Sequence, residues 1–273
     1  MCGFVKDRED IIMKKKVILI SIDGMRPDGF LKCGNPFIHE LMKKGSYTLE
    51  GSSVNPPVTL PCHMSIFHSV TPERHGMTTN TYVPMVRPIS GLFEQINCVG
   101  GVSGMFYGWE QLREVSRPYS LKRAGFVFSY SAENTDSMLA EAAISYIKSD
   151  NPDFVFLYMV ETDQKGGHDN GWMSEGYLKR VHDAIENVKQ VMDVVENEYT
   201  VIITTDHGGH ERMHGLNIPE DMTIPMFFIG PDFEPGKILS GISLLDLAPT
   251  IATIMGVPIP REWEGKSIVE ANE

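Results

Sequence analysis

The sequence contains little cysteine, and what it contains is dispersed. Four cysteines occur among 273 residues, and no two of them have the close spacing of a thiolate metal site; they are Cys2, Cys33, Cys62 and Cys98. This scarcity excludes a zinc-thiolate centre and a disulfide-rich scaffold as the basis of the fold. We therefore expect reduced thiols and a cytoplasmic location.

Long apolar runs are absent as well. The first ten residues carry charged side chains where a secretory signal needs an apolar stretch, and no run approaches the roughly 20 apolar residues that cross a bilayer. We therefore expect neither a leader nor a membrane partner. Met13, which precedes three lysines, is a candidate for the natural start. We assign residues 1–15 to a peripheral N-terminal extension and residues 16–273 to a single α/β domain.

Positive charge is scarce in this chain. Lys and Arg together number 24, against 36 Asp and Glu, so the formal net charge is −12. The sequence has no basic patch or stripe, which excludes a nucleic-acid backbone as partner. A small anionic substrate would need local positive charge, and bound divalent cations can supply it.

Three apolar, β-branched runs are each followed closely by an aspartate. The pairs are 17–22 with Asp23, 154–160 with Asp163, and 201–205 with Asp206. Such runs are typical of strands buried in a parallel sheet, and open α/β sheets bind ligands at the carboxyl ends of their strands. We predict an α/β fold, with a mostly parallel central sheet, helices on both faces and one site at that edge.

Hydrophobic periodicity predicts the remaining elements. Helices are expected over residues 36–44, 134–148, 174–195 and 244–255, and further strands over residues 46–54, 126–130 and 224–229. Pro61 suits the first turn of another helix and places the Thr59 hydroxyl at its N-terminus, where negative charge is favoured. From local sequence alone, a plain N-cap is the more common role for such a threonine.

Acids and imidazoles gather around the predicted strand ends. They divide into two candidate ligand sets, Asp23, Asp206 and His207 with the Thr59 oxygen, and Asp163, His168 and His214. Each set supplies N and O ligands and leaves room for substrate, as a catalytic metal site requires. The alternative is that Asp206 begins a turn and the histidines lie on a solvated loop.

The ordered motifs resemble the alkaline phosphatase superfamily, and most closely its nucleotide pyrophosphatase/phosphodiesterase branch. The matching segments are residues 21–27, 59–65, 71–80, 163–168, 205–208 and 245–267. The resemblance implies that Thr59 is the nucleophile, that Asn80 helps to hold the transferred phosphoryl oxygens, and that the two sets bind a pair of divalent metal ions, namely zinc. Manganese is not excluded, because the ligands contain no thiolate.

Some spacings depart from the family pattern. Asp163 and His168 are five residues apart where the family usually has four, so His168 needs a bulge within residues 164–167. The segment after His207 is short, and we prefer His214 to His210 as the last ligand because His214 precedes a glycine, as in the family motif. The stretch between Asn80 and Asp163 leaves little room for a cap domain, so nucleotide specificity does not follow.

The resemblance implies a two-metal phosphoryl hydrolase that cleaves phosphodiester or pyrophosphate bonds of a small substrate through phospho-Thr59. The alternatives are a phosphomonoesterase or phosphonate hydrolase on the same site, and a non-catalytic, metal-dependent binder of phosphorylated ligands. The sulfatase motif is absent around Cys62, and the large inserted domain of a phosphomutase is missing. The sequence gives no indication of the oligomeric state.

Overall fold

The computed structural model describes residues 15–195 and 198–270. Apart from Lys15, the predicted extension over residues 1–15 lies outside this range. Within it, Cys33 and Cys62 are buried and free. Cys98 is disulfide-bonded, so the expectation of reduced thiols is wrong at that position.

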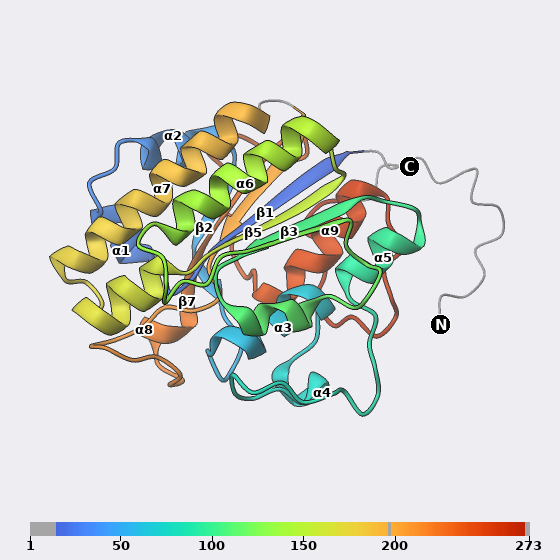
Figure 1. Cartoon of the computed structure of the whole chain (residues 1–273), viewed down its shortest axis with the longest axis horizontal. Helices are drawn as coiled ribbons and strands as arrows, with labels where there is room; N and C mark the ends of the chain where they lie inside the picture. Colours follow the sequence, from blue (N-terminus) through green and yellow to red (C-terminus); the bar gives the residue numbers. More distant parts are fainter. Residues whose placement is uncertain (1–14, 196–197, 271–273) are drawn as a thin grey trace.

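A seven-stranded sheet forms the centre of the described chain, in the order β2-β7-β6-β1-β5-β3-β4 (Figure 1). Neighbouring strands from β6 to β4 pair in parallel, whereas β7 is antiparallel to both β6 and β2. This confirms the predicted mostly parallel α/β sheet. The strands are β1 (Lys16–Ile22), β2 (Ser46–Ser52), β3 (Ser103–Tyr107), β4 (Arg123–Phe126), β5 (Phe154–Met159), β6 (Tyr199–Thr204) and β7 (Thr223–Ile229).

The strand predicted over residues 126–130 is wrong in its bounds. Strand β4 ends at Phe126, because its partner β3 ends at Tyr107 and offers no further ladder. Beyond that point the backbone N–H groups of Val127 and Ser129 donate to single carbonyls at the end of β3, and the chain turns away. Periodicity alone could not locate this end, which the length of the neighbouring strand sets.

Helices cover both faces of the sheet, as predicted (Figure 1). Successive side chains of a strand point to opposite faces, so Val17 and Leu19 of β1 join one apolar cluster and Ile18 and Ile20 the other. One face carries α1 (Pro27–Lys32), α2 (Phe37–Lys44), α6 (Thr135–Asp150) and α7 (Glu175–Val195), and the other carries α3 (Thr59–His68), α5 (Leu92–Cys98) and α9 (Leu247–Met255).

The remaining turns of helix are short. They are α4 (Pro72–His75), α8 (Pro219–Met222), 3₁₀ turns at Glu110–Val115 and Leu244–Asp246, and a π-helix at Thr162–His168. The helix predicted over residues 244–255 therefore begins as a 3₁₀ turn and continues as α9. In the described part of the chain, no helix combines the length and apolar character needed to span a membrane.

The three strands predicted to carry the site are neighbours. Strand β1 lies between β6 and β5, with Ile22 paired to Met159 and Ser21 paired to Thr204. Their carboxyl ends therefore lie at one edge of the sheet. The segments that follow them carry the three aspartates, so topology brings together side chains that are far apart in the sequence.

Candidate metal and nucleophile site

The first predicted ligand set converges at the end of β1 and β6. The ligand atoms of Asp23, Asp206 and His207 lie within 4.8 Å of one another, and all three side chains are buried. The Nε2 atom of His207 is 3.3 Å from Asp23 Oδ1 and 3.4 Å from Asp206 Oδ2. Thr59 Oγ1 lies 3.3 Å from the same Nε2 atom. The structure thus brings the predicted nucleophile and the first set together.

The second predicted set is assembled in part. Asp163 and His214 come together, with Nε2 of His214 3.9 Å from Asp163 Oδ1. The third member of this tight group is His207, so His207 lies between the two sets and stacks on His214 at a ring distance of 3.8 Å. His168 lies at the margin, outside the tight group, with its Nε2 3.5 Å from Asp163 Oδ2 and its side chain 43% exposed.

The five-residue spacing of Asp163 and His168 is resolved by the π-helix at Thr162–His168. In an α-helix, residues four apart share a face, whereas the wider π turn brings residues five apart into line. The bulge expected within residues 164–167 is therefore present, in the form of this π turn. Single π turns of this kind recur at functional sites.

The imidazoles are held with one nitrogen free. In each ring Nδ1 lies beside a backbone carbonyl, which can only accept, so Nδ1 carries the proton and Nε2 keeps its lone pair. The pairs are His207 with Gly208 at 2.7 Å, His168 with Arg212 at 2.9 Å and His214 with Pro57 at 3.0 Å. This is the orientation that a metal-binding histidine requires.

Three buried carboxylate oxygens of the site have no hydrogen-bond partner among the described residues. They are Asp23 Oδ1, Asp163 Oδ1 and Asp206 Oδ2. An unpaired buried carboxylate is strongly unfavourable, and buried charges are normally paired or bound to metal. The same oxygens face the free Nε2 atoms at 3.3–3.9 Å. The donor set therefore fits divalent cations, and it contains no thiolate that would select zinc over manganese.

The pKa shifts of the clustered side chains also fit a metal site. Burial, together with the charges of Asp206 and Asp163, raises the pKa of Asp23 well above its usual value. Burial also raises the pKa of Asp163 to about 6, and it lowers the pKa of His214, beside His207, to about 3. For Asp206, burial acts upward, but the imidazoles of His207 and His63, together with hydrogen bonds from Asp23 and the Gly24 N–H, lower the pKa on balance. His214 is thus neutral at pH 7, as a metal ligand must be.

Thr59 and Asn80 lie side by side at the start of α3. Thr59 is the first residue of that helix and is buried. The side-chain Oδ1 atom of Asn80 accepts the N–H of Leu60 at 3.0 Å. This bond uses the carbonyl oxygen of the Asn80 side chain and ties it to the residue that follows Thr59.

His210 lies in the same loop as His207 and His214 but is held elsewhere. Its Nδ1 is 2.7 Å from Oδ1 of Asp221, a fully buried carboxylate that also accepts the N–H of Leu216. The imidazole therefore anchors the loop, and His214 is the one beside Asp163.

Sequence patterns missed two aromatic residues of this site. Tyr158, on β5, donates its hydroxyl to Asp23 Oδ2, so that Oδ1 remains the free oxygen. Trp172, which follows the π-helix, donates Nε1 to the carbonyl of Gly24 at 2.9 Å. In the sequence, Tyr158 is one of several apolar positions of a buried strand, and Trp172 is an isolated aromatic residue. No sequence pattern therefore marks either of them as part of the site.

We expect Tyr158→Phe to weaken metal binding by the first set about 10- to 100-fold, the usual effect of removing a hydrogen bond that orients a ligand. The measurement is zinc titration against a chromophoric chelator. Tyr199→Phe is the matched control, because Tyr199 is a buried tyrosine on the next-but-one strand whose hydroxyl donates to the Pro152 carbonyl instead. Equal affinities in Tyr158→Phe and wild type would contradict the assigned role.

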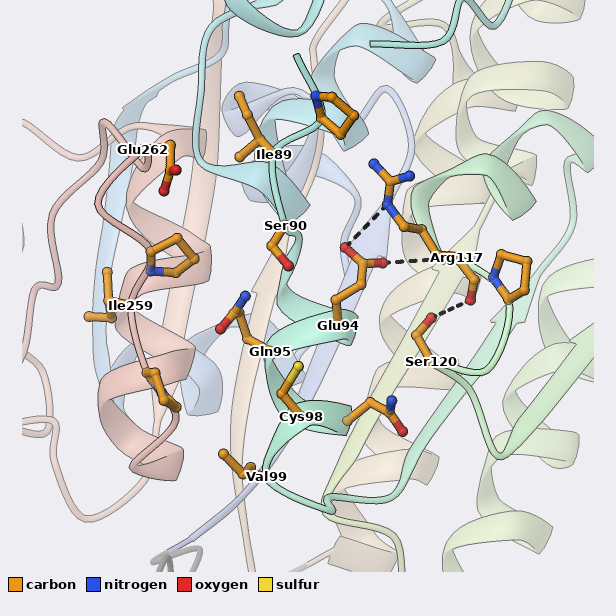
Figure 2. Close-up of a pocket in the computed structure, with 15 residues that line it drawn as sticks. Ile89, Ser90, Glu94, Gln95, Cys98, Val99, Arg117, Ser120, Ile259 and Glu262 are labelled. Atoms are coloured by element: carbon orange, nitrogen blue, oxygen red, sulfur yellow. Dashed lines mark hydrogen bonds and ion pairs between the residues drawn. The ribbon is translucent and has the colours of Figure 1, made fainter. Parts of the chain in front are cut away.

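A separate pocket of about 620 Å³ lies beside α5 (Figure 2). Its walls come from residues 88–99, 117–120 and 258–262, and they include none of the predicted site residues. Figure 2 shows Glu94 and Arg117 paired within it, with Arg117 N donating to Glu94 Oε1 at 3.2 Å. Because its walls contain none of the ligands or Thr59, this pocket is distinct from the candidate site.

Two family models match successive parts of the chain. The type I phosphodiesterase/nucleotide pyrophosphatase model matches residues 17–95, which contain Asp23, Thr59 and Asn80. The metalloenzyme superfamily model matches residues 92–259, more than half of the chain, and these contain every other predicted ligand.

The relatives and structural neighbours of this chain are named for different reactions. A 2,3-bisphosphoglycerate-independent phosphoglycerate mutase from Clostridium tetani is 30% identical over 141 residues, covering 48% of this chain and 26% of the mutase. The chain thus spans about a quarter of that relative. Murine ectonucleotide pyrophosphatase/phosphodiesterase 5 superposes with a TM-score of 0.77 at 16% identity, covering 90% of this chain and 96% of the other. A phosphonate monoester hydrolase from Silicibacter pomeroyi superposes with a TM-score of 0.74 at 14% sequence identity, covering 93% of this chain and 76% of the hydrolase.

Proposed function

This chain belongs to the metalloenzyme superfamily and has an alkaline-phosphatase-like fold. We propose that it is a two-metal hydrolase that cleaves small phosphodiesters through a covalent phospho-Thr59 intermediate. The superfamily comprises metal-dependent phosphoryl and sulfuryl hydrolases and mutases. The observation that carries the proposal is the position of Thr59 Oγ1, at a helix N-terminus and 3.3 Å from His207 Nε2. The unpartnered carboxylate oxygens lie in the same cluster.

Asp23, Asp206 and His207 would hold one cation beside Thr59, and Asp163 and His214, with His168 at the margin, a second. Zinc is the ion we propose for both. Bound divalent cations lower the pKa of a contacting hydroxyl and stabilise a departing oxyanion.

The chain's own groups then account for the transfer. Thr59 Oγ1 gives its proton to solvent water and attacks phosphorus, the bond from phosphorus to the leaving alkoxide breaks, and the alkoxide takes up a proton from water. Asn80 donates its amide N–H to a non-bridging oxygen, and the N-terminus of α3 favours the negative charge that gathers there. Water subsequently cleaves the phospho-Thr59 ester and restores the hydroxyl.

The charge of the site favours a singly charged phosphoryl group. Among the described residues, none of the three site aspartates forms an ion pair with Lys or Arg. Arg26, close to Asp23 in the sequence, is occupied by Asp28 and by the Gly209 carbonyl. A dianionic monoester therefore lacks a side-chain cation for its third oxygen, which suits a diester. A phosphonate monoester carries the same single charge and is the second candidate.

Hydrolysis of three chromogenic substrates by zinc-reconstituted protein tests the proposal. We expect kcat/KM on bis-p-nitrophenyl phosphate to exceed that on p-nitrophenyl phosphate at least about tenfold, because an unpaired second charge costs more than 1.4 kcal/mol in such a site. A p-nitrophenyl phosphonate monoester is the third substrate. Preference for the phosphate monoester would contradict the diester assignment. Binding of two zinc ions without turnover of any substrate would indicate a non-catalytic ligand binder.

A further inference from the structure

Trp172 lies against the second ligand set without belonging to it. Its side chain is buried, although it sits in the loop between the π-helix and α7. Its indole Nε1 donates to the Gly24 carbonyl at 2.9 Å, and its backbone N–H donates to the Glu211 carbonyl at 2.7 Å. The residue therefore joins the segments that follow β1, β5 and β6.

The indole contacts both outer imidazoles of the site. The ring of His168 meets it at 5.2 Å and an interplanar angle of 82°, and the ring of His214 at 6.0 Å and 65°. Both are edge contacts of the kind that aromatic quadrupoles favour. The side chain of His168 is exposed, and its Nδ1 donates to the Arg212 carbonyl. The indole and the His214 ring are the two aromatic surfaces against which its ring packs.

Two glycines make room for this ring. A Cβ atom added to Gly167 would lie 2.4 Å from an indole carbon, and one added to Gly209 would lie 2.2 Å from another. Real side chains do not approach so closely, so both positions must be glycine while Trp172 keeps its place. The packing of one side chain thus explains one glycine of each Gly-Gly pair, Gly167 beside His168 and Gly209 in the pair after His207.

We propose that Trp172 is a positioning residue that holds His168 and His214 in the geometry needed for the second metal ion. The proposal rests on the two-metal function argued above. The hydrogen bond to Gly24, the neighbour of Asp23, also fixes the second set relative to the first. Loss of the indole leaves the imidazole hydrogen bonds intact but removes the surface against which both rings pack.

The test is zinc titration of the full chain against a chromophoric chelator, with intrinsic fluorescence recorded in parallel. We expect Trp172→Phe to weaken the second zinc site at least about tenfold and the first less than about threefold, since outer contacts of metal ligands are worth 10- to 100-fold in affinity. Trp172→Ala should weaken the second site further. The zinc-dependent fluorescence change of wild type should be lost in Trp172→Phe, because the indole lies against the site.

Trp263→Phe is the matched control. Trp263 is 8% exposed and Trp172 is 7% exposed, so the two are buried to the same degree. The Nε1 atom of Trp263 also donates to a carbonyl, that of Ser90, at 2.9 Å. Trp263 belongs, however, to the apolar cluster on the other face of the sheet. Equal weakening of both zinc sites in Trp172→Phe, or equal weakening of the second site in Trp263→Phe, would overturn the proposal. If wild type binds fewer than two zinc ions, the two-metal function itself fails.

Discussion

Thr59→Ala is expected to lower kcat/KM on bis-p-nitrophenyl phosphate by at least about 10³-fold, the scale of losing a covalent nucleophile. Its zinc content should remain at two ions, because the first set keeps Asp23, Asp206 and His207. The physical reason is that the hydroxyl lies where helix α3 and the ligand cluster meet, and alanine offers no oxygen there. Steady-state kinetics together with metal analysis of the same preparations gives the measurement.

Two further variants separate chemistry from packing. Thr59→Ser retains a hydroxyl at the same place and should retain turnover well above Thr59→Ala. Thr135→Ala is the matched control, since Thr135 is also a buried threonine at the first residue of a helix, α6, and it should leave kcat unchanged. Turnover by Thr59→Ala at the wild-type rate would mean that water attacks phosphorus directly and would remove the phospho-threonine intermediate.

Removal of the divalent metals is expected to abolish turnover and to lower the melting temperature, and the second effect should grow with pH. Burial raises the pKa of Asp163 to about 6 and that of Asp23 well above its usual value. An acid whose pKa is raised on folding contributes stability below its unfolded pKa of about 4 and loses it as the pH rises through the folded value. His214, whose pKa burial lowers to about 3, acts in the opposite direction up to its unfolded pKa of about 6.5. The metal-free protein should therefore lose stability mainly above about pH 6.5, where only the aspartate contribution is still falling.

Zinc reverses this trend, because it binds the deprotonated ligands more tightly as the pH rises. With zinc at about 100 times its dissociation constant, binding contributes about 2.7 kcal/mol, so the melting temperature should rise by roughly 5–10 °C at pH 8 and by less at pH 5. Calorimetry with and without chelator measures both. Asp163→Asn is the control variant, since its metal-free form should show a shallower loss of stability with pH. A zinc effect that is constant across this range would contradict the assigned cluster.

The α/β class and the edge that carries the site could be predicted from the sequence because both depend on local patterns. Continuous β-branched runs specify buried strands, and the acids that follow them specify which edge is polar. The resemblance to a known family supplied the remaining assignments, and the structure places Thr59 beside His207 and Asn80 beside Leu60. What stays a prediction is that these groups bind metal and react.

Only the tertiary structure decided how the ligands are shared and held. The position of His207 between both sets depends on β6 and β5 flanking β1, an order that no local pattern encodes. In the sequence, Tyr158 and Trp172 cannot be told from ordinary buried aromatic residues. Only the folded structure places Tyr158 beside Asp23 and Trp172 beside His168. The sequence by itself determined which chemical groups the chain possesses and which segments form the buried strands that carry the site, because these are properties of short segments. Distances between groups far apart in the chain arise from packing, and only the folded molecule sets them.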